Sequence, residues 1–101
     1  MLNHKVTIMN DTNYSARYRM ETFEQFTERM NNQYGINFEV KVEGNDVEVT
    51  MLRNHSKVAT KMFPINYLFS FIREDKLTYS EKIVQSVKIA VRLMAKNYNF
   101  C

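Results

Sequence analysis

The sequence predicts an α+β fold: an antiparallel sheet with a three-stranded meander over residues 36–62, covered by a long C-terminal helix. Apolar and polar residues alternate through most of this stretch, as they do in strands with one buried face. The chain near its C-terminal end instead carries apolar residues at helical spacing, to about residue 98. A sheet that is apolar on one face needs a cover, which helices flanking it in the sequence can supply. The length of 101 residues fits one domain, residues 1–101.

The first two strands of the meander form a hairpin. Alternating segments over residues 36–43 and 46–53 flank a two-residue loop, Gly44–Asn45, and glycine readily adopts the positive φ that such turns require. The register that places the apolar residues together on one face pairs Val42 with Val47, Val40 with Val49, and Phe38 with Met51. On the other face, Lys41 then lies opposite Glu48.

A third strand follows a second short loop at Asn54–His55. Residues 56–62 continue the alternation, and we expect Val58 against Met51, Thr60 against Val49, and Met62 against Val47. The face to be covered then consists of Phe38, Val40, Val49, Met51 and Val58. On the solvent face, Lys41, Glu48 and Lys61 form a row of alternating charge.

Residues 4–20 fit two interpretations. Residues 4–9 form a short β-favouring run, and alternation over residues 14–20 would pair them back on it as a hairpin. The second of these segments also continues a helical seam, which would give one helix over residues 14–34.

The choice between them depends on a helix start signal. Thr22 and Gln25 have the spacing of a capping box, in which each residue bonds the backbone N–H of the other. We therefore expect a hairpin over residues 4–20 and a helix over residues 22–34, ended by Gly35 in the left-handed conformation.

Two further helices follow the sheet. Pro64 suits the first turn of a helix, and apolar residues continue at helical spacing to about Arg73. A second capping box, Thr78 with Glu81, starts the longest helix, which runs to about Tyr98. The side chains expected to form its sheet-facing stripe are Ile83, Val84, Val87, Ala90, Val91, Met94 and Tyr98. Ile89 and Leu93 widen this apolar surface, either to pack on the 64–73 helix or to meet a partner.

The polar side of the last helix is strongly basic. Lys88, Arg92 and Lys96 follow one another at i,i+4 spacing, where like charges repel. We take as candidate partner-binding residues Lys82, Lys88, Arg92 and Lys96, with Lys57 and Lys61 as a second set on the open sheet face. Exposed substitutions usually change stability by within ~0.5 kcal/mol, so reversing Lys88 and Arg92 to Glu should leave folding nearly intact. The alternative to a binding site is that these six residues form an ordinary solvated surface.

Charge divides the chain into two halves. The first fifty residues carry five Lys or Arg against eight Asp or Glu, and the remainder carry nine against three. Such asymmetry bears on partners and not on the fold. No run approaches the ~18 apolar residues of a membrane span, and the N-terminus lacks the apolar core of a signal peptide. We therefore expect a cytoplasmic protein with no membrane partner. Its single cysteine, Cys101, cannot form an internal disulfide.

The composition is rich in Asn, Lys, Tyr, Phe, Ile and Met, with only two Gly and one Pro. It resembles the short accessory proteins of phages and mobile elements in low-GC bacteria, a group that includes many anti-CRISPR proteins. The resemblance is one of composition and transfers no functional residue. It implies a small protein that inhibits a host or defence complex by binding to it.

Motifs for catalysis are missing from the sequence. Nothing matches a phosphate loop, a zinc spacing, a nucleophile elbow or a dinucleotide fingerprint. His55 beside Ser56 could form a base and a nucleophile, but both residue types are common in turns for their local hydrogen bonds. The acidic residues do not converge on one point as metal ligands would. We expect no enzyme activity, no cofactor and no metal.

Three functions remain. The first is the inhibitor of a host or defence protein complex, CRISPR–Cas-like, which could act at that complex's nucleic-acid-binding surface. The second is direct binding of nucleic acid, because the order helix, three strands, helix over residues 22–98 is similar to the double-stranded-RNA-binding domain, which recognises A-form shape. In that family a lysine-rich cluster opens the last helix, whereas here the opening is Thr78 to Lys82 and most of the basic residues follow later. The third is a homo-oligomer, such as a homodimer, in which the acidic half of one copy docks on the basic half of another.

Overall fold

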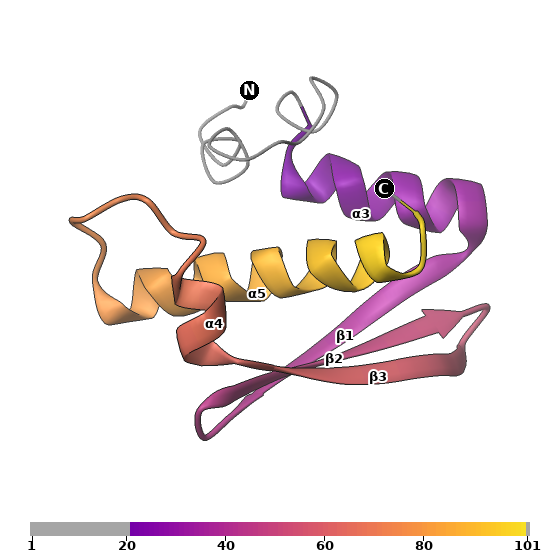
Figure 1. Ribbon diagram of the computed structural model, residues 1–101. Coiled ribbons are helices and arrows are strands. Elements are labelled where there is room, and N and C mark those ends of the chain that lie inside the picture. The colour runs from indigo at the N-terminus through magenta and orange to yellow at the C-terminus, as the bar shows by residue number, and fades with distance from the viewer. Residues whose placement is uncertain (1–20, 101) are drawn as a thin grey trace.

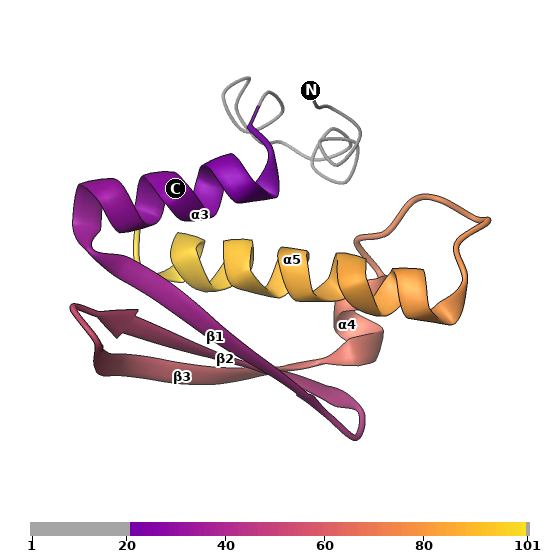
Figure 2. The same ribbon diagram turned by 180° about the vertical axis from the view of Figure 1, so that it is seen from behind.

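The computed structural model describes residues 21–100, so the expected hairpin over residues 4–20 lies outside the described residues. The elements are α3 (Phe23–Tyr34), β1 (Ile36–Glu43), β2 (Asp46–Arg53), β3 (Ser56–Pro64), α4 (Ile65–Phe69) and α5 (Tyr79–Asn97). The strands form one antiparallel sheet in the order β1-β2-β3. Figures 1 and 2 show α5 across one face of the sheet, with α3 beside it on the same side. The predicted α+β class, with a meander covered by the C-terminal helix, is confirmed.

The capping box at the start of α3 is present. Gln25 donates its backbone N–H to Thr22 Oγ1 at 3.0 Å, and Thr22 donates its own to Gln25 Oε1 at 3.0 Å. Thr22 has an extended backbone, so α3 begins at Phe23 and does not continue from the residues before it. Gly35 ends the helix with φ of 68°, in the left-handed region as predicted.

The second capping box starts α5 in the same way. Glu81 donates its backbone N–H to Thr78 Oγ1 at 3.2 Å, and Thr78 donates to Glu81 Oε1 at 2.8 Å. By contrast, α4 ends at Phe69, before the expected limit near Arg73. The next three N–H groups, those of Ser70, Phe71 and Ile72, bond carbonyls only three residues back, which tightens the chain into turns instead of extending the α-helix.

The predicted register of the first hairpin is confirmed. Val42 pairs with Val47, Val40 with Val49, Phe38 with Met51, and Lys41 with Glu48. Gly44 has φ of 60°, which explains why a two-residue loop begins with glycine here.

The predicted register of the second hairpin is wrong beyond its first two pairs. Leu52 lies opposite Lys57, in keeping with the Asn54–His55 loop, but Met51 then lies opposite Ala59 and not Val58. Val58 is the extra residue of a bulge, and every later pair is shifted by one position. Val49 therefore faces Lys61, and Val47 faces Phe63.

The bulge has a clear packing benefit. It turns Phe63 into the core, where it is buried, and leaves Met62 51% exposed. An aromatic ring buries more apolar surface than a methionine does at this position, next to the equally buried Ile65. The shift also brings the hydroxyls of Thr50 and Thr60 within 3.1 Å of each other. The expected row of Lys41, Glu48 and Lys61 does not form, because Met62 faces Glu48.

The core lies between the sheet and the helices. Its fully or almost fully buried apolar side chains are Phe26, Met30, Ile36, Val47, Val49, Met51, Phe63, Ile65, Leu68, Ile89, Ala90, Val91, Met94 and Ala95. Of the face expected to be covered, Val49 and Met51 are buried and Phe38 is partly buried, whereas Val40 and Val58 are exposed. Val58 is exposed because it is the bulge residue, and Val40 lies on an edge strand.

The buried arc of α5 is rotated from the expected stripe. Val84 and Tyr98 are exposed, while Ser86, Ile89 and Arg92 are buried. The reason is that α5 contacts α4 and residues of α3 in addition to the sheet, so the buried arc is wide. Ile89 and the partly buried Leu93 belong to the core and do not form an exposed patch.

Candidate functional surfaces

Arg92, the centre of the predicted basic row, is buried. Only 4% of it is exposed, and its guanidinium carbon lies 4.7 Å from the centre of the Phe26 ring. Its Nη2 donates to the backbone carbonyl of Glu21 at 3.2 Å. The expectation of a solvated Arg92 is therefore wrong, because α3 packs over this side of α5, and we no longer expect its reversal to Glu to leave folding intact.

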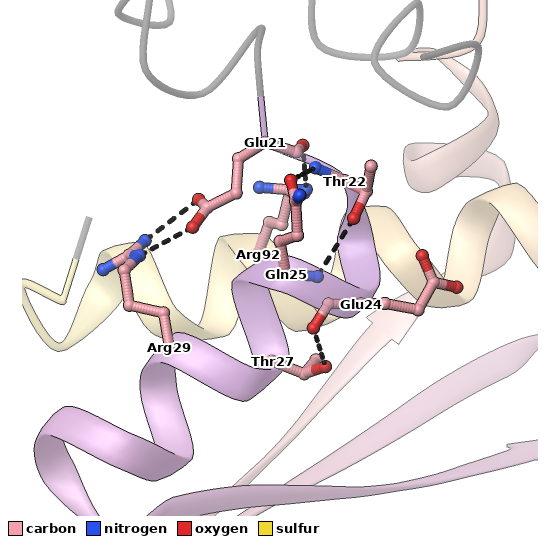
Figure 3. A network of polar contacts seen from close by, with 7 residues as sticks. All are labelled: Glu21, Thr22, Glu24, Gln25, Thr27, Arg29 and Arg92. Carbon is pink, nitrogen blue, oxygen red and sulfur yellow. Dashed lines mark hydrogen bonds and ion pairs between the residues drawn. The ribbon is translucent and has the colours of Figure 1, made fainter. Parts of the chain in front are cut away.

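Glu21 is itself held by a second arginine. Arg29 Nε lies 2.7 Å from Glu21 Oε2, and Arg29 Nη2 lies 3.2 Å from Oε1, in the two-pronged geometry that arginine forms with carboxylates. Figure 3 shows Arg29 at the carboxylate of Glu21 and Arg92 at its backbone carbonyl. This cluster fixes the entry to α3, so its charges serve the fold.

Other lysines of the predicted set lie over aromatic rings. The ammonium nitrogen of Lys82 is 5.6 Å from the centre of the Phe69 ring, and that of Lys88 is 5.9 Å from Phe23. Lys61 is placed 5.6 Å from Phe63 in the same way. Such contacts contribute about 0.5–1 kcal/mol each at exposed sites, and they occupy one side of each cation.

The six candidate residues do not form one patch. Lys82 lies against α4, Lys88 and Arg92 lie against α3, and the exposed Lys96 is in the last turn of α5. Lys57 lies across the sheet from α5, because it pairs with Leu52 on the other side of β2 from the buried valines. The prediction that Lys61 shares the open sheet face with Lys57 is wrong, because the bulge pairs Lys61 with the buried Val49 on the helix-facing side of the sheet. The structure therefore divides the basic residues among separate surfaces.

No helix within residues 21–100 covers the opposite side of the sheet (Figure 1). We call this surface the open face; its depressed centre has a volume of about 430 Å³ and is lined by Glu39, Val40, Lys41, Glu48, Thr50 and Lys57. Acidic and basic side chains alternate across it, and Lys41 lies 3.7 Å from Glu43 along the same strand. The sequence predicted both the alternation of these side chains and an open face, but it did not predict the depression at its centre.

A second, more apolar groove runs between α3, β1 and α5. It has a volume of about 290 Å³ and is lined by Phe23, Thr27, Asn37, Phe38, Val40, Val87 and Val91. Next to it, Val40 and Val42 on β1 are 36% and 44% exposed. We call this surface the β1 groove. Its residues come from three elements that only the tertiary structure brings together.

Chemistry-bearing side chains do not gather elsewhere in the described part of the chain. Within residues 21–100, no three His, Cys, Asp or Glu side chains come close enough to share a metal ion. His55 is exposed in the β2–β3 turn, where its φ of 71° serves the turn geometry. No helix in this range is long and apolar enough to cross a lipid bilayer.

Comparisons of the chain with models of protein families, with curated proteins and with solved structures gave no match.

Proposed function

We propose that this protein is a non-enzymatic binding protein that inhibits a host or defence protein complex, of the CRISPR–Cas kind, by occupying part of its surface. The observation that carries the proposal is the open face. Its depressed centre is lined by two glutamates, Glu39 and Glu48, interspersed with two lysines, Lys41 and Lys57. Mixed charge of this kind complements another protein surface better than it complements a polyanion.

Apolar side chains support the same choice of partner. Met62 faces Glu48 across the sheet and is 51% exposed, as is the bulge residue Val58. Protein interfaces combine an apolar centre with a polar rim, and methionine is enriched in them. The composition, which resembles that of phage accessory proteins, supports a defence complex as the target.

The proposal is tested in a bacterium that carries an active CRISPR–Cas system and is transformed with a targeted plasmid. We expect the wild-type protein to restore plasmid recovery. The double charge reversal Glu48→Lys/Lys57→Glu should abolish that effect, because it inverts charges at the centre of the open face while preserving net charge. Lys96→Glu, on the opposite side of the sheet, is the matched control and should remain inhibitory.

Two outcomes would overturn the proposal. Failure of the wild type to restore recovery against representatives of the major CRISPR–Cas types would remove the defence complex as the target. Full activity of the open-face variant would remove the open face as the docking surface. Circular dichroism of each purified variant separates loss of binding from loss of folding.

Direct nucleic-acid binding is the second candidate, favoured by the observed order of one helix, three antiparallel strands and a final long helix, although the short helix α4 stands between β3 and α5. The test is binding to short labelled RNA and DNA duplexes at low and moderate salt. Tight binding that weakens steeply with salt would favour it, because each neutralised phosphate releases counterions. The triple variant Lys82→Glu/Lys88→Glu/Lys96→Glu should then lose affinity, whereas the open-face variant should not.

A further inference from the structure

The two edges of the sheet differ in how well they are protected against pairing with another strand. β3 carries a bulge at Val58, Lys57 and Lys61 beside it, and Pro64 at its end. Bulges, lysines and proline are the devices by which natural sheets block edge pairing. β1 has neither a bulge nor a proline along its eight residues. Within residues 21–100, no segment pairs with its outer side.

Among the described residues, the outer edge of β1 presents unpaired backbone groups next to exposed apolar side chains. In a hairpin closed by a two-residue loop, the residues flanking the loop are hydrogen bonded, and bonded pairs recur at every second position. The β1 residues that bond β2 in this way are Asn37, Glu39, Lys41 and Glu43. The N–H and C=O groups directed outward therefore belong to Phe38, Val40 and Val42. Figure 2 shows β1 as the outer strand, with its hairpin end extending away from α3.

We propose that two copies of this chain dimerise by antiparallel pairing of their β1 edges, with Val40 opposite Val40 at the twofold axis. The two sheets then form one continuous sheet. In this register, Phe38 of each copy lies opposite Val42 of the other, and all the outward backbone groups of this stretch find partners. The dimer is an interaction additional to the proposed inhibition of a defence complex.

The charges and the length of β1 together favour this register. With Val40 on the axis, Glu39 of each copy faces Lys41 of the other, which gives two opposite-charge pairs on the open-face side. A shift that places Lys41 on the axis would oppose lysine to lysine and Glu39 to Glu43. A shift that places Phe38 on the twofold axis would put Lys41 opposite Gly35, which lies outside β1. Cross-strand like charges are destabilising, which disfavours the Lys41-centred alignment. An alignment centred on Val42 would also pair opposite charges, Lys41 with Glu43, but it would pair only residues 41–43 of the two strands, whereas the Val40-centred alignment pairs residues 37–43.

The β1 groove fits the same arrangement. Val42 of the second copy lies beside Phe38, which lines the groove together with Val40 and Val87. Val40 and Val42 are 36% and 44% exposed in the single chain and would be covered in the dimer. One strand edge is smaller than a standard interface, so we expect a dissociation constant in the micromolar range or weaker.

The test is sedimentation equilibrium of the full chain from about 10 µM to about 1 mM, a range chosen for an interface of this size. A reducing agent prevents cross-linking through Cys101. We expect a reversible monomer–dimer equilibrium. Glu39→Lys or Lys41→Glu alone should raise the dissociation constant about tenfold or more, because the twofold axis repeats each new like-charge contact.

Mixing these two single variants gives the decisive result. A copy carrying Glu39→Lys presents two lysines, and a copy carrying Lys41→Glu presents two glutamates, so the mixture should form a heterodimer about as tight as the wild-type dimer. Only a register that pairs residue 39 with residue 41 predicts this recovery. The variant Val40→Pro should abolish dimers while keeping the β1–β2 ladder, because the N–H that it removes faces outward.

Three results would overturn the inference. A wild-type chain that stays monomeric throughout the range has no such dimer. A dimer that survives Val40→Pro uses another surface. A dimer weakened by both single reversals but not regained on mixing has a different register, such as the docking of acidic and basic halves. None of these results depends on the plasmid-recovery assay.

Discussion

The guanidinium of Arg92 lies 4.7 Å from the centre of the Phe26 ring and donates a hydrogen bond to the carbonyl of Glu21, which joins α5 to the start of α3. The side chain is buried, so its aliphatic part is also packed. We expect Arg92→Ala to lower the free energy of unfolding by about 2–3 kcal/mol, through lost packing, the ring contact and the unpaired carbonyl.

The matched variant Lys96→Ala, on the exposed end of the same helix, should change stability by less than about 0.5 kcal/mol. Urea denaturation followed by circular dichroism measures both. Equal, small effects of the two substitutions would show that Arg92 is solvated after all. Arg92→Glu should be more damaging than Arg92→Ala, because it buries a carboxylate against the Glu21 carbonyl.

The bulge in β3 makes a second prediction, since it separates two valines that share a face in the unbulged register. Val58 is 51% exposed, and Val49 is fully buried. Val58→Ala should change the free energy of unfolding by within about 0.5 kcal/mol, whereas Val49→Ala should lower it by about 2–3 kcal/mol. Thermal and urea denaturation of the two variants provide the comparison; a large loss from Val58→Ala would support the unbulged register.

Two glycines with positive φ make a third prediction. A Cβ on Gly35 would lie 2.7 Å from Asn54 Oδ1 in the β2–β3 turn, whereas a Cβ on Gly44 would meet nothing within 4 Å. Both alanine substitutions carry the left-handed backbone cost of about 1–2 kcal/mol. Gly35→Ala should be the more destabilising of the two, because the Asn54 side chain must also shift.

The double variant Gly35→Ala/Asn54→Gly separates the two contributions. It removes the side chain that the new Cβ would meet, and Asn54 already has φ of 51°, which glycine adopts freely. Its loss should fall to about that of Gly44→Ala. If removing the Asn54 side chain recovers nothing, the excess cost of Gly35→Ala does not come from this contact.

Ser86 provides a fourth prediction. It is fully buried in α5, and its Oγ has no hydrogen-bond partner among the described residues. Ser86→Ala removes a polar atom that gains nothing from burial and introduces the best helix former, so stability should rise by about 0.5–1.5 kcal/mol. Differential scanning calorimetry detects this as a higher melting temperature, and an unchanged or lower value would indicate that the hydroxyl is satisfied.

The sequence by itself determined the local structure of the described chain. Both capping boxes, the left-handed Gly35 and the Gly44–Asn45 hairpin depend on residues close together in the chain, whose hydrogen bonds and backbone preferences act within one turn. The register of the first hairpin follows for the same reason: a two-residue loop leaves few alternatives, and alternation excludes a slip of one residue.

Only the tertiary structure decided which residues are buried by contacts that extend beyond one turn or one hairpin. The bulge at Val58 depends on the free energy gained by burying Phe63 against the helices. The alternation of residues along the strand gives no information about that free energy. Arg92 is buried because α3 packs beside α5, so a row of basic residues on a helical wheel did not reveal which were exposed. Burial depends on contacts between segments far apart in the chain. These contacts place Lys82, Lys88 and Arg92 against α4 and α3, where they stabilise the fold, and leave Lys57 on the open face.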